Sequence, residues 1–131
     1  MKKTKAPVKK IAAKKAGDDI TVYHNTRCSK SREACSILEE EGVQFKTIEY
    51  LKTPPTQAKI KELLKMLGIK AAKLVRKSEP LFREKFEGEK LTEAQWIKAL
   101  AENPILIERP IIVKGKKAII ARPPEKVLEL I

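Results

Sequence analysis

Long apolar runs are missing from this sequence of 131 residues, and so are the patterns of a secretory signal and a mitochondrial transit peptide. No stretch approaches the roughly 18 apolar residues that a membrane-spanning helix needs. The N-terminus lacks the apolar core of about 7–15 residues that marks a secretory signal. The first arginine is Arg27, which argues against a mitochondrial transit peptide. We therefore expect a cytoplasmic protein with no membrane partner.

Cysteine, histidine and aromatic residues are scarce. The two cysteines, Cys28 and Cys35, cannot build a disulfide framework and suit a reducing compartment. Together with His24, the single histidine, they are too few and too badly spaced to hold zinc, so we expect no metal. The six aromatic residues are scattered and offer no stacking platform for single strands, so we expect no specific nucleic-acid partner.

Acidic residues are absent from the first 17 positions, which carry seven lysines and therefore most of the formal net charge of +12. A lysine- and alanine-rich segment of this kind is typical of a disordered, solvated extension, and we predict one over residues 1–19. The alternative is nonspecific contact with nucleic acid or an acidic membrane surface. Residues 20–131 suffice for one domain with one hydrophobic core.

The N-terminal half of this domain has the pattern of a β-α-β unit. It predicts a strand at Ile20–Tyr23, a helix at Ser29–Glu41 that ends at Gly42, and a second strand at Val43–Tyr50. Two parallel strands joined by a right-handed crossover are the usual result. Helical segments follow at 56–67, 71–76, 81–86 and, after a capping box, from Thr92 to Asn103.

The C-terminal part returns to strands. Residues 111–121 read as an antiparallel hairpin, and Pro123-Pro124 opens a last helix with Val127, Leu128 and Ile131 inward. The order of elements looks like an α/β, thioredoxin-like fold: a mixed four-stranded sheet with a helical insertion between its β-α-β and β-β-α halves. In that fold a cis-proline precedes the third strand, and Pro110 is the candidate.

Cys28 lies where the first strand has passed through a loop into the first helix. Its sulfur is expected near the unpaired backbone N–H groups of the helix start, where negative charge is favoured. Arg27, Lys30 and Arg32 crowd the same turn. We predict a lowered thiol pKa and a nucleophilic thiolate. The alternative is a small buried residue among solvated charges.

Five short motifs occur in a fixed order: His24-Asn25-x-x-Cys28-x-x-Ser31-Arg32, Tyr50-Leu51-x-Thr53-Pro54-Pro55, Leu74-Val75-Arg76-Lys77, Asn103-Pro104-Ile105-Leu106-Ile107-x-Arg109-Pro110-Ile111 and Arg122-Pro123-x-Glu125. Together they resemble the glutaredoxin-coupled arsenate reductase family, and the likeness runs from about Ile20 to the C-terminus. Such an ordered set is far more specific than a single cysteine motif.

The resemblance implies a role for each matching residue. Cys28 matches the nucleophile, His24 a histidine that helps to lower the thiol pKa, and Ser31 a helix-turn serine. Three arginines that hold the oxyanion match Arg76, Arg109 and Arg122. Arginine suits arsenate because its planar fork of donors stays charged and matches a tetrahedral anion. Without the resemblance, His24, Ser31 and Arg76 would more often be ordinary loop and helix residues. Arg109 and Arg122 could then either bind an anion or merely orient turns.

Cys35 has no predicted role in the chemistry. It follows Cys28 by seven residues on one helix, which sets the Cα atoms ~10 Å apart, beyond the ~4.4–6.8 Å that a disulfide allows. We expect Cys35 in the core. Ser31 stands where a second thiol would complete C-x-x-C, so a reductant must come from outside the chain. Neither cysteine begins a C-x5-R loop, which argues against the phosphatase-like arsenate reductases.

The favoured hypothesis is therefore an oxidoreductase that reduces arsenate in arsenic detoxification, with glutathione as co-substrate, glutaredoxin as partner and no bound cofactor, as the resemblance implies. One alternative is a partner-binding regulator of the Spx type, which binds RNA polymerase. Another is a glutathione-dependent thiol-disulfide oxidoreductase that acts on mixed disulfides without arsenate.

Overall fold

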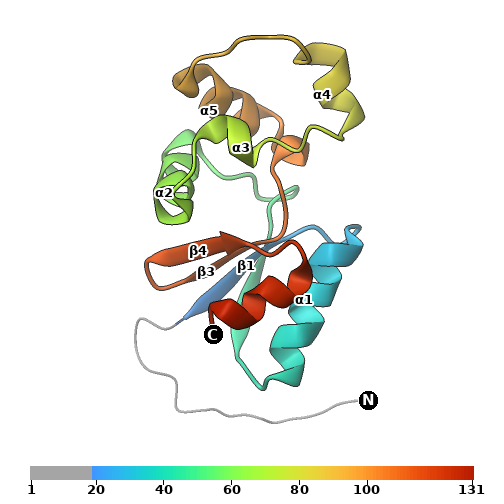
Figure 1. Cartoon of the computed structure of the whole chain (residues 1–131), viewed down its shortest axis with the longest axis vertical. Coiled ribbons are helices and arrows are strands. Elements are labelled where there is room, and N and C mark those ends of the chain that lie inside the picture. The colour runs from blue at the N-terminus through green and yellow to red at the C-terminus, as the bar shows by residue number, and fades with distance from the viewer. Residues whose placement is uncertain (1–18) are drawn as a thin grey trace. The chain divides into compact units, whose positions relative to one another are not determined.

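The computed structural model describes residues 19–131, which fall into two compact units (Figure 1). Residues 19–49 and 109–131 form one, here called the sheet unit, and residues 50–108 form the other, the helical unit. Except for Asp19, the predicted N-terminal extension lies outside the described residues.

The sheet unit begins with the predicted β-α-β arrangement. Strand β1 (Ile20–His24) runs parallel to β2 (Phe45–Glu49), and helix α1 (Ser29–Glu40) connects them. β2 begins two residues later than predicted, because the Val43 N–H still bonds the carbonyl of Leu38 at the end of the helix. The alternation of side chains between the sheet faces therefore starts only at Phe45.

The hairpin completes a four-stranded sheet in the order β2-β1-β3-β4. Strands β3 (Ile111–Lys114) and β4 (Lys117–Ile120) are antiparallel, and β3 is also antiparallel to β1. Helix α1 packs beside the C-terminal 3₁₀ helix η3 (Pro124–Glu129) (Figure 1). The core between them and the sheet contains Ile20, Val22, Ala34, Leu38, Ile112, Ala121 and Val127. This is the predicted thioredoxin-like fold.

The C-terminal helix differs from the prediction in one respect. It is a 3₁₀ helix, in which residues three apart share a face. Val127 is fully buried and Leu130 is partly buried against the same core, whereas Leu128 is 46% exposed. The prediction that Leu128 points inward was therefore wrong.

Two peptide bonds in the sheet unit are cis. The Arg109–Pro110 bond confirms the predicted cis-proline before β3. The Arg122–Pro123 bond, which follows β4, was not predicted.

Four α-helices form the helical unit, in agreement with the predicted insertion: α2 (Gln57–Leu67), α3 (Ala71–Leu74), α4 (Pro80–Lys85) and α5 (Glu93–Glu102), followed by the 3₁₀ turn η2 (Pro104–Leu106). Thr56 caps α2 and Gly68 ends it with φ +71°. Thr92 and Gln95 form the predicted capping box of α5. The aromatic rings of Phe82, Phe86 and Trp96 pack together between α4 and α5.

Helix α3 is shorter than predicted. Val75 and Arg76 leave the helix because Val75 pairs in an isolated antiparallel bridge with Ile107. The pairing is fixed by hydrogen bonds from Arg76 N to Leu106 O at 2.7 Å and from Glu108 N to Leu74 O at 2.8 Å. Within residues 19–131, no helix has the length and apolar character required to cross a membrane.

Candidate active site around Cys28

Cys28 is the N-cap residue of α1. Its backbone is extended, with φ −93° and ψ 119°, and its N–H bonds the carbonyl of Asn25 at 3.0 Å. The Asn25 side chain accepts a hydrogen bond from Arg27 N at 2.9 Å and is almost fully buried. This turn sets the cysteine at the helix start, where negative charge on the sulfur is favoured although its side chain makes no capping hydrogen bond.

The surroundings of Cys28 favour its ionised form. Burial is the largest single influence on the pKa of the thiol and raises it. Four groups act in the opposite direction and together bring the pKa of Cys28 below its ordinary value: the backbone N–H of Ser31, the side chain of Arg109, the backbone N–H of Lys30 and the charge of Arg122. At neutral pH a larger share of this thiol is therefore nucleophilic.

Two of the predicted arginines meet at the sulfur. Arg122 Nη2 lies 3.5 Å from Cys28 Sγ, and Arg122 Nε donates to the carbonyl oxygen of Arg109 at 2.6 Å. Arg109 is only 6% exposed. Because both guanidiniums stay charged at any relevant pH, they place fixed positive charge next to the sulfur. An oxyanion that approaches Cys28 thus meets donors on the sheet unit itself.

His24 and Ser31 are in direct contact. Ser31 Oγ accepts a hydrogen bond from Asn25 N at 3.1 Å and lies 2.6 Å from His24 Nδ1. Burial, the largest influence, lowers the pKa of His24 and favours the neutral imidazole, and one hydrogen bond joins its Nδ1 to the serine hydroxyl. Ser31 is fully buried, so this pair links the end of β1 to the first turn of α1.

Cys35 lies in a different environment on the same helix. Its sulfur is 3.9 Å from His24 Nδ1, and the residue is partly buried against the core of the sheet unit. Burial, with a smaller contribution from Glu39, raises the pKa of Cys35 to about 11. Its thiol is therefore protonated at neutral pH. Both cysteines are free thiols.

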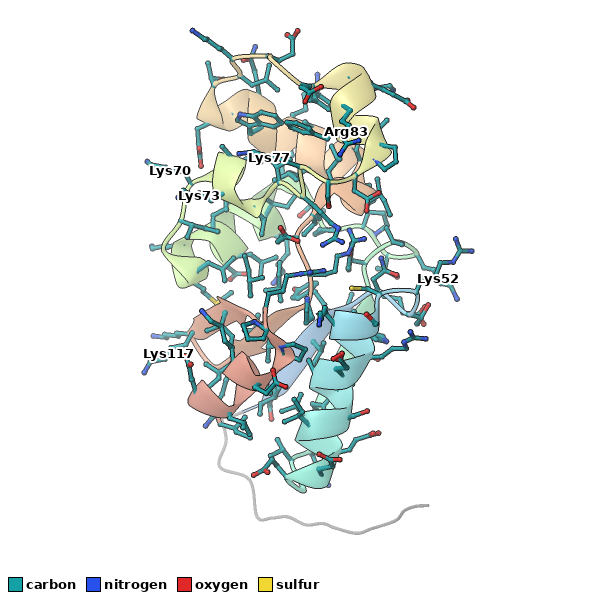
Figure 2. The ribbon with its side chains drawn as sticks, turned by 45° about the vertical axis from the view of Figure 1, so that its right-hand side comes forward. Lys52, Lys70, Lys73, Lys77, Arg83 and Lys117 are labelled. Atoms are coloured by element: carbon teal, nitrogen blue, oxygen red, sulfur yellow. The ribbon has the colours of Figure 1, made fainter. Side chains whose placement is uncertain are left out.

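Arg76 belongs to the helical unit. Its guanidinium donates from Nη1 to Glu108 Oε1 at 3.1 Å, and its Nε lies 3.4 Å from Glu79 Oε2. The neighbouring Lys73 and Lys77 are exposed, and Lys73 projects away from the ribbon (Figure 2). Arg76 instead is half-buried, because the two carboxylates and the Val75–Ile107 bridge hold it.

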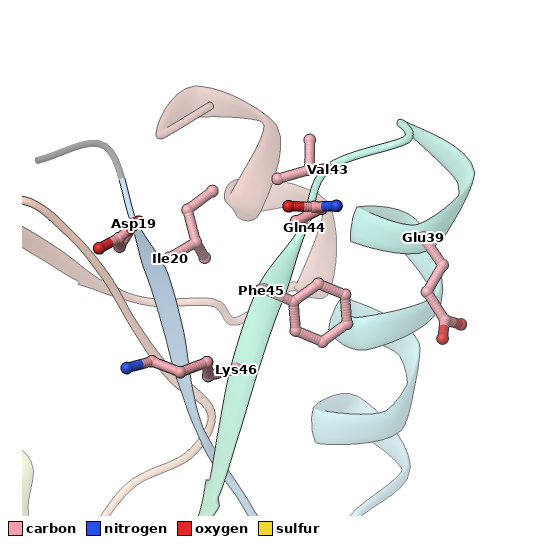
Figure 3. Close-up of a pocket in the computed structure, with 7 residues that line it drawn as sticks. All are labelled: Asp19, Ile20, Glu39, Val43, Gln44, Phe45 and Lys46. Atoms are coloured by element: carbon pink, nitrogen blue, oxygen red, sulfur yellow. The ribbon is translucent and has the colours of Figure 1, made fainter. Parts of the chain in front are cut away.

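A groove in the sheet unit lies far from this chemistry. It opens at the start of β1 and β2, and Figure 3 shows the residues that line it: Asp19, Ile20, Glu39, Val43, Gln44, Phe45 and Lys46. Cys28 follows the opposite end of β1. Since the lining contains neither a cysteine nor an arginine, we place the candidate site at Cys28.

The helix-start N–H groups that were expected near the sulfur are those of Lys30 and Ser31. Sequence reasoning missed two features of the site. Asn25 shapes the turn, for which an Asn three residues before the cysteine was a usable cue. The pairing of Arg76 with Glu108 spans 32 residues and had no local signal.

The fold and the site together define the class: a thioredoxin-like protein with a cysteine of lowered pKa at the start of its first helix and two arginines at the sulfur. A model of the ArsC family matches residues 23–130. The chain therefore belongs to the ArsC family.

Individual proteins agree with this assignment. The chain is 46% identical to the "Uncharacterized protein YfgD" of Escherichia coli over 114 residues, which cover 86% of this chain and 96% of that protein. It is 37% identical to an arsenate reductase of Neisseria meningitidis, with 83% and 95% covered. The solved structure of an arsenate reductase from Vibrio cholerae superimposes with a TM-score of 0.82 at 39% identity, with 86% of this chain and 98% of that chain covered.

Proposed function

We propose that this protein is an arsenate reductase that uses glutathione as co-substrate and glutaredoxin as partner, in the reducing cytoplasm. The observation that carries the proposal is the ionisable thiol of Cys28 with Arg109 and Arg122 at its sulfur. Arsenate is an anion with several acceptor oxygens, and these guanidiniums offer the matching donors. Membership in the ArsC family and the arsenate reductases among its relatives support the same substrate.

In the proposed first step, the Cys28 thiolate attacks arsenic and forms a sulfur–arsenic bond, while one arsenate oxygen leaves as water or hydroxide. Arg109 and Arg122 hold the remaining oxygens and balance their charge during the attack. Arg76 is proposed as the third oxyanion arginine on its motif, Leu74-Val75-Arg76-Lys77. His24 and Ser31 hold the loop that carries the nucleophile.

In the second step, glutathione thiolate attacks the Cys28 sulfur. The sulfur–arsenic bond breaks with its electron pair on arsenic, so arsenic(V) becomes arsenic(III) and leaves as arsenite. The two thiols supply both electrons and end as a mixed disulfide. A glutaredoxin thiol then attacks the glutathione sulfur of this disulfide, takes up the glutathione as a new mixed disulfide and releases the Cys28 thiolate. An external reductant is required because Ser31 stands where a resolving cysteine would be, and Cys35 lies too far along α1.

The direct test is arsenate-dependent NADPH oxidation coupled through glutathione, glutathione reductase and glutaredoxin. We expect turnover in the natural protein, none above background for Cys28→Ser, and turnover for the matched control Cys35→Ser. Equal rates for the natural protein and Cys28→Ser would reject the proposal.

NADPH oxidation also distinguishes an arsenate reductase from a thiol-disulfide oxidoreductase, when a glutathionylated peptide is the substrate. A thiol-disulfide oxidoreductase would reduce a glutathionylated peptide at the same rate with and without arsenate. The lowered pKa of Cys28 serves either reaction, but two arginines at the sulfur favour an oxyanion substrate. We therefore expect the rate of NADPH oxidation to depend on arsenate.

A further inference from the structure

Glu108 is held beside Arg76 by backbone as well as side-chain contacts. The Arg76 N–H bonds the carbonyl of Leu106, and the Glu108 N–H bonds the carbonyl of Leu74, on either side of the Val75–Ile107 bridge, so Arg76 and Glu108 lie diagonally across that bridge and on the same face of it. Their side chains then meet, with 3.1 Å between Arg76 Nη1 and Glu108 Oε1. The backbone pairing therefore positions these two side chains next to each other.

Glu79 adds a second carboxylate to the same guanidinium, 3.4 Å from Nε. The three side chains remain between 18% and 25% exposed, so a small ion can reach them. One arginine flanked by two glutamates carries a local net charge of −1. A group of this charge repels a fully ionised anion, unless the anion brings a proton that a carboxylate can accept.

Oxyanions differ in this respect. Arsenate and phosphate retain at least one proton near neutral pH and therefore present an O–H donor, whereas sulfate has none. A carboxylate has about four lone-pair positions and can accept such an O–H while it also pairs with an arginine. A site that needs this hydrogen bond rejects an analogue without the proton, because it leaves two like charges in contact.

We propose that Glu108 is a specificity-determining residue that accepts the hydrogen of a protonated oxyanion held by Arg76, and so selects arsenate over sulfate. This inference rests on the proposed function, which makes Arg76 an oxyanion ligand. Glu79 holds the guanidinium from its other edge and acts as a positioning residue.

The experiment compares phosphate, an unreactive and protonated oxyanion, with sulfate. Both are titrated into the natural protein and into Glu108→Gln by isothermal calorimetry without glutathione, at pH 7. We expect the natural protein to prefer phosphate. In Glu108→Gln the repulsion of sulfate is gone and the amide can donate to it, so the preference falls roughly 10-fold or more, as expected for a hydrogen bond to a charged group.

Glu84→Gln is the matched control, because Glu84 is exposed in the same unit and the change removes the same charge. It should leave the phosphate-to-sulfate ratio unchanged. Glu108→Asp keeps the charge but shortens its reach, and should lower the affinity for phosphate while sulfate stays rejected. This second variant tests the proposal even if Glu108→Gln does not fold.

One result would overturn this inference and leave the proposed function intact. It is an unchanged ratio of phosphate to sulfate affinity in Glu108→Gln, including an equal change in both affinities, while the natural protein reduces arsenate. Absence of arsenate turnover in the natural protein is a different result, since it rejects the proposed function before any variant is made.

Discussion

Cys28 and Cys35 lie on one helix, seven residues apart, and the structure gives them opposite acidities. Cys28 caps the start of α1, where amide N–H groups and two arginines outweigh the effect of burial. Cys35 lies two turns further on, where the backbone donors are already used within the helix and burial raises its pKa to about 11. The reactivity of a thiol here depends on its place along the helix and not on the helix alone.

The largest expected effect separates the two thiols by function. Cys28→Ser should lower arsenate turnover by roughly three orders of magnitude or more, because the only proposed nucleophile is lost. Cys35→Ser should retain most of the rate, since its sulfur has no step in the reaction. Initial rates in the glutaredoxin-coupled assay measure both, and a large loss in Cys35→Ser would break the comparison.

Alkylation by iodoacetamide against pH tests the acidities directly. In Cys35→Ser, the remaining Cys28 should react at a rate that rises with pH and has its midpoint below the ordinary thiol pKa, since its pKa is lowered. In Cys28→Ser, the rate at Cys35 should still rise as the pH approaches its pKa of about 11. At neutral pH this predicts roughly a 100-fold difference or more in thiolate fraction. Coincident profiles would contradict the prediction.

Ser31 lies between the two cysteines and links α1 to the loop before Cys28. Ser31→Ala leaves the buried Asn25 N–H and His24 Nδ1 without this partner, so the free energy of unfolding should fall by about 1–3 kcal/mol. Urea denaturation measures the change, with Ser36→Ala, an exposed position on the same helix, as the control. An equal loss of unfolding free energy in Ser31→Ala and Ser36→Ala would contradict the prediction that the hydrogen bonds of Ser31 stabilise the loop.

The smallest effect concerns a single charge at the sulfur. Arg122→Gln removes the guanidinium 3.5 Å from Cys28 Sγ, so the pKa of Cys28 should rise and the alkylation rate at pH 7 should fall. We expect about a threefold change, because the sulfur is partly exposed and solvent screens the charge. Arg27→Gln, which neutralises an exposed arginine in the same loop, should leave the rate unchanged.

Much of the fold could be predicted because local signals mark its boundaries. The Thr92 capping box begins α5, and Pro110 is cis before β3, as predicted. The errors arise where a distant segment decides the conformation. Val75 and Arg76 leave α3 to pair with residues 30 or more positions away, and no local periodicity contains that information.

The site divides in the same way. The reactive position of Cys28 follows from a helix start that the sequence displays, and the structure supports a lowered pKa there. The motifs predicted Arg109 and Arg122 as site residues. They flank the β3–β4 hairpin, and the fold places both near the Cys28 sulfur. The environment of Arg76 could not be predicted, because Glu108 reaches it only through tertiary pairing.

The capping position of Cys28 also bears on how the protein returns to its starting state. When the sulfur is bonded to arsenic or to another sulfur, it loses its negative charge, and the N-terminus of α1 loses the anion that its amides and arginines stabilise. Every contact that favours the thiolate therefore raises the free energy of each covalent form relative to the resting protein. In the proposed reaction, the same contacts would favour both attack by the Cys28 thiolate at neutral pH and its departure from a mixed disulfide.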